Sequence, residues 1–156
     1  MRGFTLIELV VVMGITILLS GAGIAAYNQF NNRQRVRSGG AGLTDLLRLA
    51  QNRALTGEKP TGGACASSAL DGHQVRWTGS QFVLEAVCGG QAVDVGKNYS
   101  LGSDVAVTAG DQVVFKVLAQ GTSGEFFCLT GYGWLYRVRV LGSGEVVEDG
   151  FVEACQ

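Results

Sequence analysis

Residues 4–27 of the chain read FTLIELVVVMGITILLSGAGIAAY, and Glu8 is the only charged residue among them. A helix of this length extends about 36 Å, which is enough to cross the hydrocarbon core of a bilayer. A carboxylate placed there costs about 2.5–3.5 kcal/mol. Because membrane anchoring alone does not require Glu8, we expect its carboxylate to have a partner.

The residues around Glu8 form a specific motif. Residues 2–9 read RGFTLIEL and resemble the processing site of type IV prepilins and type II secretion pseudopilins. The resemblance implies that prepilin peptidase cuts between Gly3 and Phe4 and that the new amino group of Phe4 is methylated. It also implies that Glu8 sets the register between subunits by pairing with a neighbour's N-terminal amine, which would compensate a buried carboxylate. The chain departs from the family in having no proline within the apolar helix.

Two other interpretations of the apolar stretch remain open. An ordinary secretory signal peptide needs a cleavage site of small residues, and residues 24–26, Ile-Ala-Ala, could loosely supply one. A plain single-span anchor would leave Glu8 unexplained. The prepilin interpretation divides the chain into a leader (1–3), a transmembrane and filament-core helix (4–32) and an exported head (33–156).

Charge is distributed unevenly along the chain. Residues 1–56 contain six arginines against Glu8 and Asp45, a balance of +4, whereas residues 57–156 contain six basic and eleven acidic side chains, a balance of −5. The sum is the net charge of −1. Because an acidic head repels phosphate backbones, we do not expect broad binding of nucleic acid.

The four cysteines indicate disulfides. They show no CxxC spacing and the chain has one histidine, so a metal site of the zinc type is not expected. A membrane-targeting start implies an oxidising exterior, where disulfides form. Of the three pairings, we favour Cys65–Cys88 with Cys128–Cys155, each closing a loop of about 20–30 residues and contributing about 3–4 kcal/mol. Free buried thiols are the alternative.

The helix should extend past the apolar stretch. We expect it to run from Phe4 to about Asn32, to continue through residues 33–37, and to be kinked or broken by the glycines of residues 38–42. A second helix should then start near Thr44 and end at Gly57. Its apolar stripe should cover a sheet, and it consists of Leu43, Leu46, Leu47, Ala50 and Ala54.

After Pro60 the pattern changes to short alternating segments joined by glycine turns. Three pairs of segments are typical of hairpins: 73–78 with 81–87, 104–108 with 112–118, and 124–130 with 134–141. Residues 145–148 should add a last short strand. Within the third pair, Val138 and Val140 should point inward and Arg137 and Arg139 outward. A long N-terminal helix packed on an antiparallel β-sheet head is an α+β fold.

The head resembles the GspH/FimT group of minor pseudopilins and pilins. The resemblance is carried by the helix-end segment 49–57, by residues 113–116 followed by Gly121, and by residues 136–146. Some pilins of the FimT kind bind DNA through basic residues near the C-terminus. Arg137 and Arg139 are therefore the candidate DNA contacts here, although the acidic residues around them argue for a solvated strand face.

No residue pattern indicates an enzyme or a cofactor. His73 stands alone and is expected on a strand surface, and no serine has a basic residue near it in a catalytic pattern. Several aspartates lie beside expected turns, where local hydrogen bonding is their usual role and a turn calcium site is the alternative. These are Asp71, Asp94, Asp104 and Asp111.

Together these features predict a pilin-like filament subunit, a minor pilin or pseudopilin of a type IV pilus or type II secretion system. The expected location is the inner membrane, crossed once with the head outside the cytoplasm, and then a periplasmic or cell-surface filament. The expected partners are other pilin or pseudopilin subunits, prepilin peptidase, the inner-membrane assembly platform and the membrane itself. The alternatives are a pilus-tip subunit that binds DNA for uptake and a secreted, disulfide-bonded binding domain.

Overall fold

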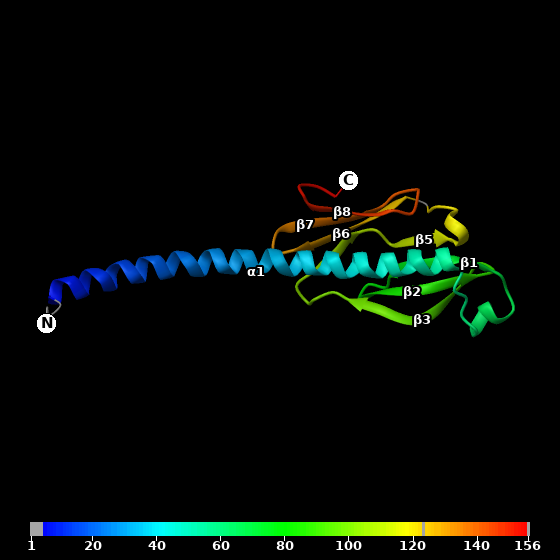
Figure 1. Ribbon diagram of the computed structural model, residues 1–156, viewed down its shortest axis with the longest axis horizontal. Helices are drawn as coiled ribbons and strands as arrows, with labels where there is room; N and C mark the ends of the chain where they lie inside the picture. The colour runs from blue at the N-terminus through cyan, green and yellow to red at the C-terminus, as the bar shows by residue number, and fades with distance from the viewer. Residues whose placement is uncertain (1–4, 123, 156) are drawn as a thin grey trace. The chain divides into compact units, whose positions relative to one another are not determined.

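The computed structural model describes residues 5–122 and 124–155, without the side chains of residues 21–23, 25 and 119. The fold is α+β, with the long helix α1 (Leu6–Thr56) followed by strands (Figure 1). The chain divides into two units, Met1–Gln34 and Arg35–Gln156, and the second is called the head below. The remaining elements are η1 (Gly63–Ala66), β1 (Leu70–Trp77), β2 (Gln81–Cys88), β3 (Gln91–Ser100), β4 (Ala106–Ala109), β5 (Gln112–Lys116), η2 (Val117–Ala119), β6 (Glu125–Gly131), β7 (Trp134–Val140) and β8 (Val146–Val152).

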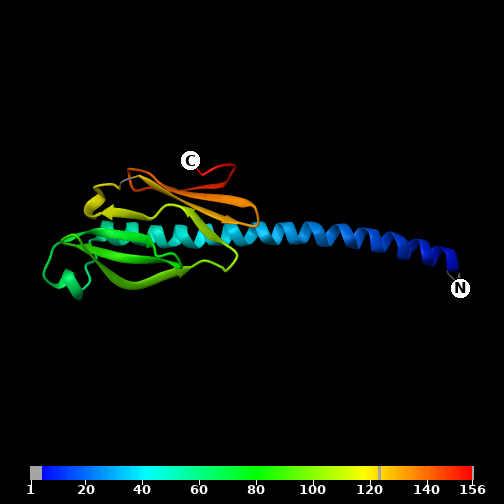
Figure 2. The same cartoon turned by 180° about the vertical axis from the view of Figure 1, so that it is seen from behind.

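The strands form two antiparallel four-stranded sheets where a single sheet was expected. Sheet A has the order β3-β2-β1-β5 and sheet B the order β4-β6-β7-β8. Figures 1 and 2 both place β2 and β3 on one side of the C-terminal half of α1 and β6, β7 and β8 on the other. Within the head, the helix is therefore covered by strands from both sheets.

Two of the three expected hairpins are confirmed. β1 pairs with β2, and β6 pairs with β7. The expected hairpin of residues 104–108 with 112–118 is wrong, because β4 pairs with β6 in sheet B whereas β5 pairs with β1 in sheet A. The chain changes sheet at Gly110, where φ is +95° and a Cβ atom would collide with the carbonyl oxygen of Phe126. The expected last strand is present as β8, and β3 was not predicted.

The expected break at residues 38–42 is also wrong, because α1 is continuous through them. A Cβ atom at Gly40 would overlap the ring of Tyr136, and one at Gly42 would overlap the ring of Tyr99. The glycines thus allow two aromatic rings from the sheets to pack directly on the helix backbone. Thr44 does not cap a helix, since its Oγ1 donates to the carbonyl of Gly40 at 3.0 Å.

The core lies between α1 and both sheets. All five residues of the expected apolar stripe, 43, 46, 47, 50 and 54, are buried. Phe82 of sheet A meets Phe127 of sheet B with ring centroids 5.2 Å apart, which joins the sheets beneath the helix. Val138 and Val140 point inward as predicted. The helix ends at Thr56, and Gly57 follows with a φ of +67°, a conformation that favours glycine.

Both favoured disulfides are present. Cys65 of η1 bonds to Cys88 at the end of β2, with Cα atoms 5.1 Å apart. Cys128 of β6 bonds to Cys155 in the C-terminal tail, with Cα atoms 6.0 Å apart. The first disulfide therefore attaches the segment after the helix to sheet A, and the second attaches the tail to sheet B.

Candidate functional site

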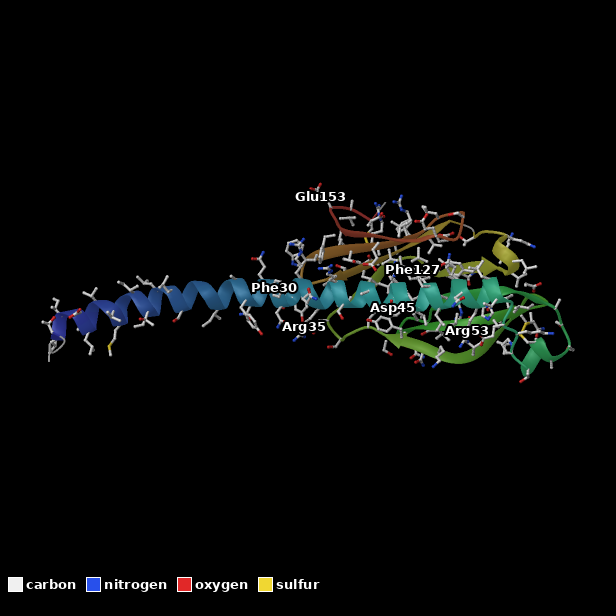
Figure 3. All side chains as sticks on the ribbon, viewed as in Figure 1. Phe30, Arg35, Asp45, Arg53, Phe127 and Glu153 are labelled. Atoms are coloured by element: carbon white, nitrogen blue, oxygen red, sulfur yellow. A yellow bond between two sulfur atoms is a disulfide. The ribbon has the colours of Figure 1, made fainter. Side chains whose placement is uncertain are left out.

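The N-terminal unit carries an apolar surface without a cover. Every large apolar side chain described between Leu6 and Phe30 is more than half exposed, from 51% at Leu9 to 84% at Leu6. In Figure 3 the side chains of the helix before Phe30 point away from it on several sides. Exposed apolar surface of this extent is a sign of a missing partner, either protein or membrane. Among the described residues, no helix combines the length and the apolar character that crossing a membrane requires.

Glu8 lies in the first turn of α1 within this surface. Its backbone N–H donates to Oγ1 of Thr5 at 3.4 Å, so Thr5 caps the helix N-terminus. The helix dipole favours a carboxylate in the first turn, and this interaction contributes about 0.3–1 kcal/mol to helix stability. Gly3 and Phe4, the predicted processing residues, lie outside the described residues.

The other polar side chains of this stretch are satisfied by the helix itself. The hydroxyl of Thr16 donates to the carbonyl of Val12 at 2.7 Å, and that of Ser20 donates to the carbonyl of Thr16 at 2.8 Å. Such bonds hide hydroxyl groups in an apolar environment. Within the described part of the chain, the carboxylate of Glu8 makes no such bond and no ion pair. If this surface were buried against another helix or in a membrane, the carboxylate of Glu8 would require a partner from outside.

The head holds the two candidate DNA contacts together, at one carboxylate. Nε of Arg137 lies 2.7 Å from Oδ2 of Asp149, and a terminal nitrogen of Arg139 lies 2.8 Å from Oδ1. Nearby, the hydroxyl of Tyr136 donates to Glu148 at 2.7 Å. Burial, as the largest single cause, and the carboxylate of Glu148 raise the pKa of Tyr136 to about 12. The charge of the two arginines is thus partly neutralised by Asp149 of β8.

The sequence predicted His73 on a strand surface, and this is wrong. The residue is fully buried in β1. Neither of its ring nitrogens has a hydrogen-bond partner. Burial lowers the pKa of His73, and the positive charge of Arg53 lowers it further against a smaller opposing effect of Glu58. Strand alternation alone does not say which face of a two-sheet head is buried, and that is why the sequence misplaced this residue.

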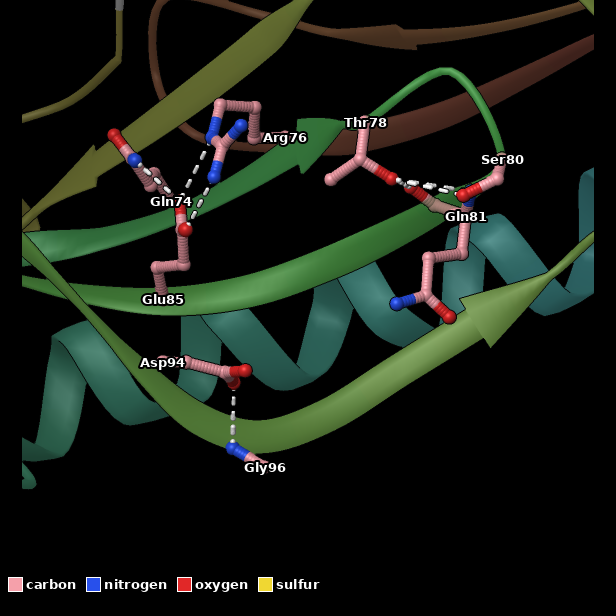
Figure 4. A network of polar contacts seen from close by, with 8 residues as sticks. All are labelled: Gln74, Arg76, Thr78, Ser80, Gln81, Glu85, Asp94 and Gly96. Carbon is pink, nitrogen blue, oxygen red and sulfur yellow. Dashed lines mark hydrogen bonds and ion pairs between the residues drawn. The ribbon is translucent and has the colours of Figure 1, made fainter.

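A polar network in sheet A was also missed (Figure 4). The buried carboxylate of Glu85 accepts bonds from Gln74 at 2.7 Å and from two nitrogens of Arg76 at 3.1 and 2.6 Å. The Arg76 guanidinium, together with Gln74, holds the pKa of Glu85 below its usual range in spite of burial. The signal was a single acid within the apolar strand FVLEAV, placed beside Gln74 by the register of the hairpin.

Of the turn aspartates, Asp94 makes a local bond as expected, whereas Asp71 bonds to the turn between β2 and β3. Asp71 accepts from the N–H of Gly90 at 2.8 Å, and Asp94 accepts from the N–H of Gly96 at 2.7 Å. Asp104 differs, because it accepts from Arg35 of the helix at 3.0 Å. No group of three potential metal-ligating side chains occurs within residues 5–122 and 124–155.

No family model, no curated protein and no solved structure matches the chain.

Proposed function

We propose that the chain is a pilin-like filament subunit, a minor pilin or pseudopilin of a type IV pilus or type II secretion system. Prepilin peptidase would remove residues 1–3, and residues 4–32 would hold the protein in the inner membrane until the assembly platform extracts it. The head would then lie on the outside of a periplasmic or cell-surface filament.

One observation carries this proposal: among the described residues, an exposed apolar helix surface contains a single carboxylate, and no described residue pairs with it. Leu6 and Ile17 are 84% and 72% exposed on the same helix as Glu8. Neighbouring copies of such a helix would cover the apolar surface. The amine of a processed N-terminus would neutralise Glu8 within it, where an unpaired charge is costly.

A secreted binding domain is less well supported, because it would leave the glutamate of the motif without a role. A DNA-binding tip subunit is also less well supported, since Asp149 occupies both Arg137 and Arg139. The disulfides are compatible with all three functions, as each places the head in an oxidising compartment.

Replacement of Glu8 tests the proposal in the native cell. We expect Glu8→Ala to reach the membrane normally and to be lost from sheared or purified filaments by tenfold or more. Asp45→Ala is the matched control, because it removes an exposed acid from the same helix within the head and should assemble normally. Incorporation of Glu8→Ala at the level of the control would contradict the proposal.

A further inference from the structure

His73 is an anomaly of the head. Its side chain is fully buried in the middle of β1, and both ring nitrogens lack a hydrogen-bond partner. Most buried polar side chains in folded proteins have at least one partner. A neutral imidazole tolerates such a position at moderate cost, whereas a buried, unpaired imidazolium is much more expensive.

The groups around His73 disfavour protonation of its imidazole further. Across the sheet its neighbours in register are Ala86 of β2 and Phe115 of β5, and neither carries a charge. The last turn of α1 provides Arg53, whose Nε is buried without a hydrogen bond and lies 3.5 Å from the more exposed Glu58. Arg53 and Glu58 are the charged groups that act on His73, and the stronger influence is repulsive.

His73 is linked to the surroundings of the first disulfide through the register of β1 and β2. Its partner in register, Ala86, belongs to a small apolar cluster with Cys65 and Cys88, and both sulfur-bearing residues are fully buried. This cluster is separate from the main core that joins α1 to the two sheets. A disturbance at His73 can therefore reach the Cys65–Cys88 cluster through Ala86, as it can reach the main core through Phe115.

We propose that His73 is an acid-sensitive latch, whose protonation releases the end of α1 from sheet A and exposes the buried Cys65–Cys88 disulfide. The Cys128–Cys155 bond joins β6 of sheet B to the half-buried Cys155 of the tail, and its reactivity should not depend on His73. The latch concerns the head alone and does not depend on filament assembly. It would make the stability of one disulfide respond to the acidity of the compartment outside the cell membrane.

The direction of the effect follows from the lowered pKa of the buried imidazole. In the open state His73 titrates near its ordinary value of about 6.5, whereas in the closed state it binds a proton only at lower pH. The closed state is therefore fully favoured above about pH 6.5 and loses stability as the pH falls below it. Between the two pKa values, the open fraction should rise up to tenfold per pH unit.

The test measures reduction of each disulfide in the full, oxidised chain in detergent. A water-soluble phosphine reacts with each disulfide and one water molecule: the two thiols take the hydrogens of the water, and the phosphine is oxidised to its oxide with the oxygen. The thiols are trapped with a maleimide and located by peptide mass spectrometry between about pH 7.5 and 5. Rates are divided by those of the unfolded chain, so that the intrinsic pH dependence of the reagent cancels.

In the native chain, reduction of Cys65–Cys88 should accelerate up to tenfold per pH unit below about pH 6.5, while the corrected rate for Cys128–Cys155 stays constant with pH. His73→Phe should remove the acceleration. Arg53→Gln, a milder change, should weaken it by raising the pKa of His73 in the closed state. Equal acceleration in His73→Phe, parallel reduction of both disulfides, or no pH dependence in the native chain would overturn the proposal.

Discussion

Glu85 is a buried acid whose charge is compensated by hydrogen bonds from two neighbouring side chains, Gln74 and Arg76. Its carboxylate is buried in the β1–β2 hairpin and held by Gln74 and Arg76, and Arg76 itself is 42% exposed. The same charge would be costly without its guanidinium partner. Because its pKa is lowered in the folded head, the network stabilises the head above the ordinary carboxyl pKa and is lost as the pH falls below it.

We therefore expect Arg76→Met to lower the free energy of unfolding by about 1–3 kcal/mol at neutral pH, since it leaves a buried carboxylate short of donors. Urea denaturation of the oxidised head measures the change. Arg48→Met, which removes an exposed arginine of α1, should stay within about 0.5 kcal/mol of the native head. Equal effects of the two substitutions would show that the network contributes nothing specific.

Asp149 has the corresponding role for the candidate DNA contacts. Because it binds Arg137 and Arg139 together, we expect the head to bind duplex DNA weakly at about 150 mM salt. Asp149→Asn should strengthen binding by removing the carboxylate that both arginines share, and Arg137→Ala with Arg139→Ala should change little in the native head. Fluorescence anisotropy decides this: submicromolar binding that the double substitution abolishes would favour the DNA-uptake alternative.

At the scale of elements, periodicity predicted the buried face of the helix. It did not predict features that depend on contacts between residues far apart in the sequence. The stripe from Leu43 to Ala54 follows the helical period and is buried as expected. The glycines at 40 and 42 were interpreted as a break because their partners, Tyr136 and Tyr99, lie far along the chain. The change of sheet at Gly110 likewise depends on Phe126, so alternation and a turn there suggested a hairpin that does not form.

Gly40→Ala distinguishes a packing glycine from a hinge. A methyl group there would overlap Tyr136, and overpacking costs about 1–3 kcal/mol. That cost should exceed the gain in helix propensity of about 1 kcal/mol, so we expect a net loss of stability. Gly102→Ala is the control, because its added methyl group meets open space. Thermal unfolding of the head provides the measurement, and a stabilised Gly40→Ala would indicate that the close contact does not exist.

At the scale of the whole molecule, Glu8 was easier to single out from the sequence than the buried polar residues of the head. Glu8 could be singled out because one charge in an apolar stretch is visible without any tertiary contact. His73 and Glu85 could not be assigned in the same way, since their burial results from two sheets closing on one helix. The disulfides could be predicted in part. The spacing of the cysteines favoured one pairing, and the folded chain contains that pairing.

We expect this chain to be processed and assembled as a pilin-like subunit. The decisive measurement is the mature N-terminus of the protein, isolated from its native membrane or filament and read by mass spectrometry of the N-terminal peptide. We predict that it starts at Phe4 and carries a methyl group on the α-amine, and that a bulky residue in place of Gly3 blocks the cut. A mature protein that starts at Met1, or near Tyr27 after signal-peptide cleavage, would contradict the account.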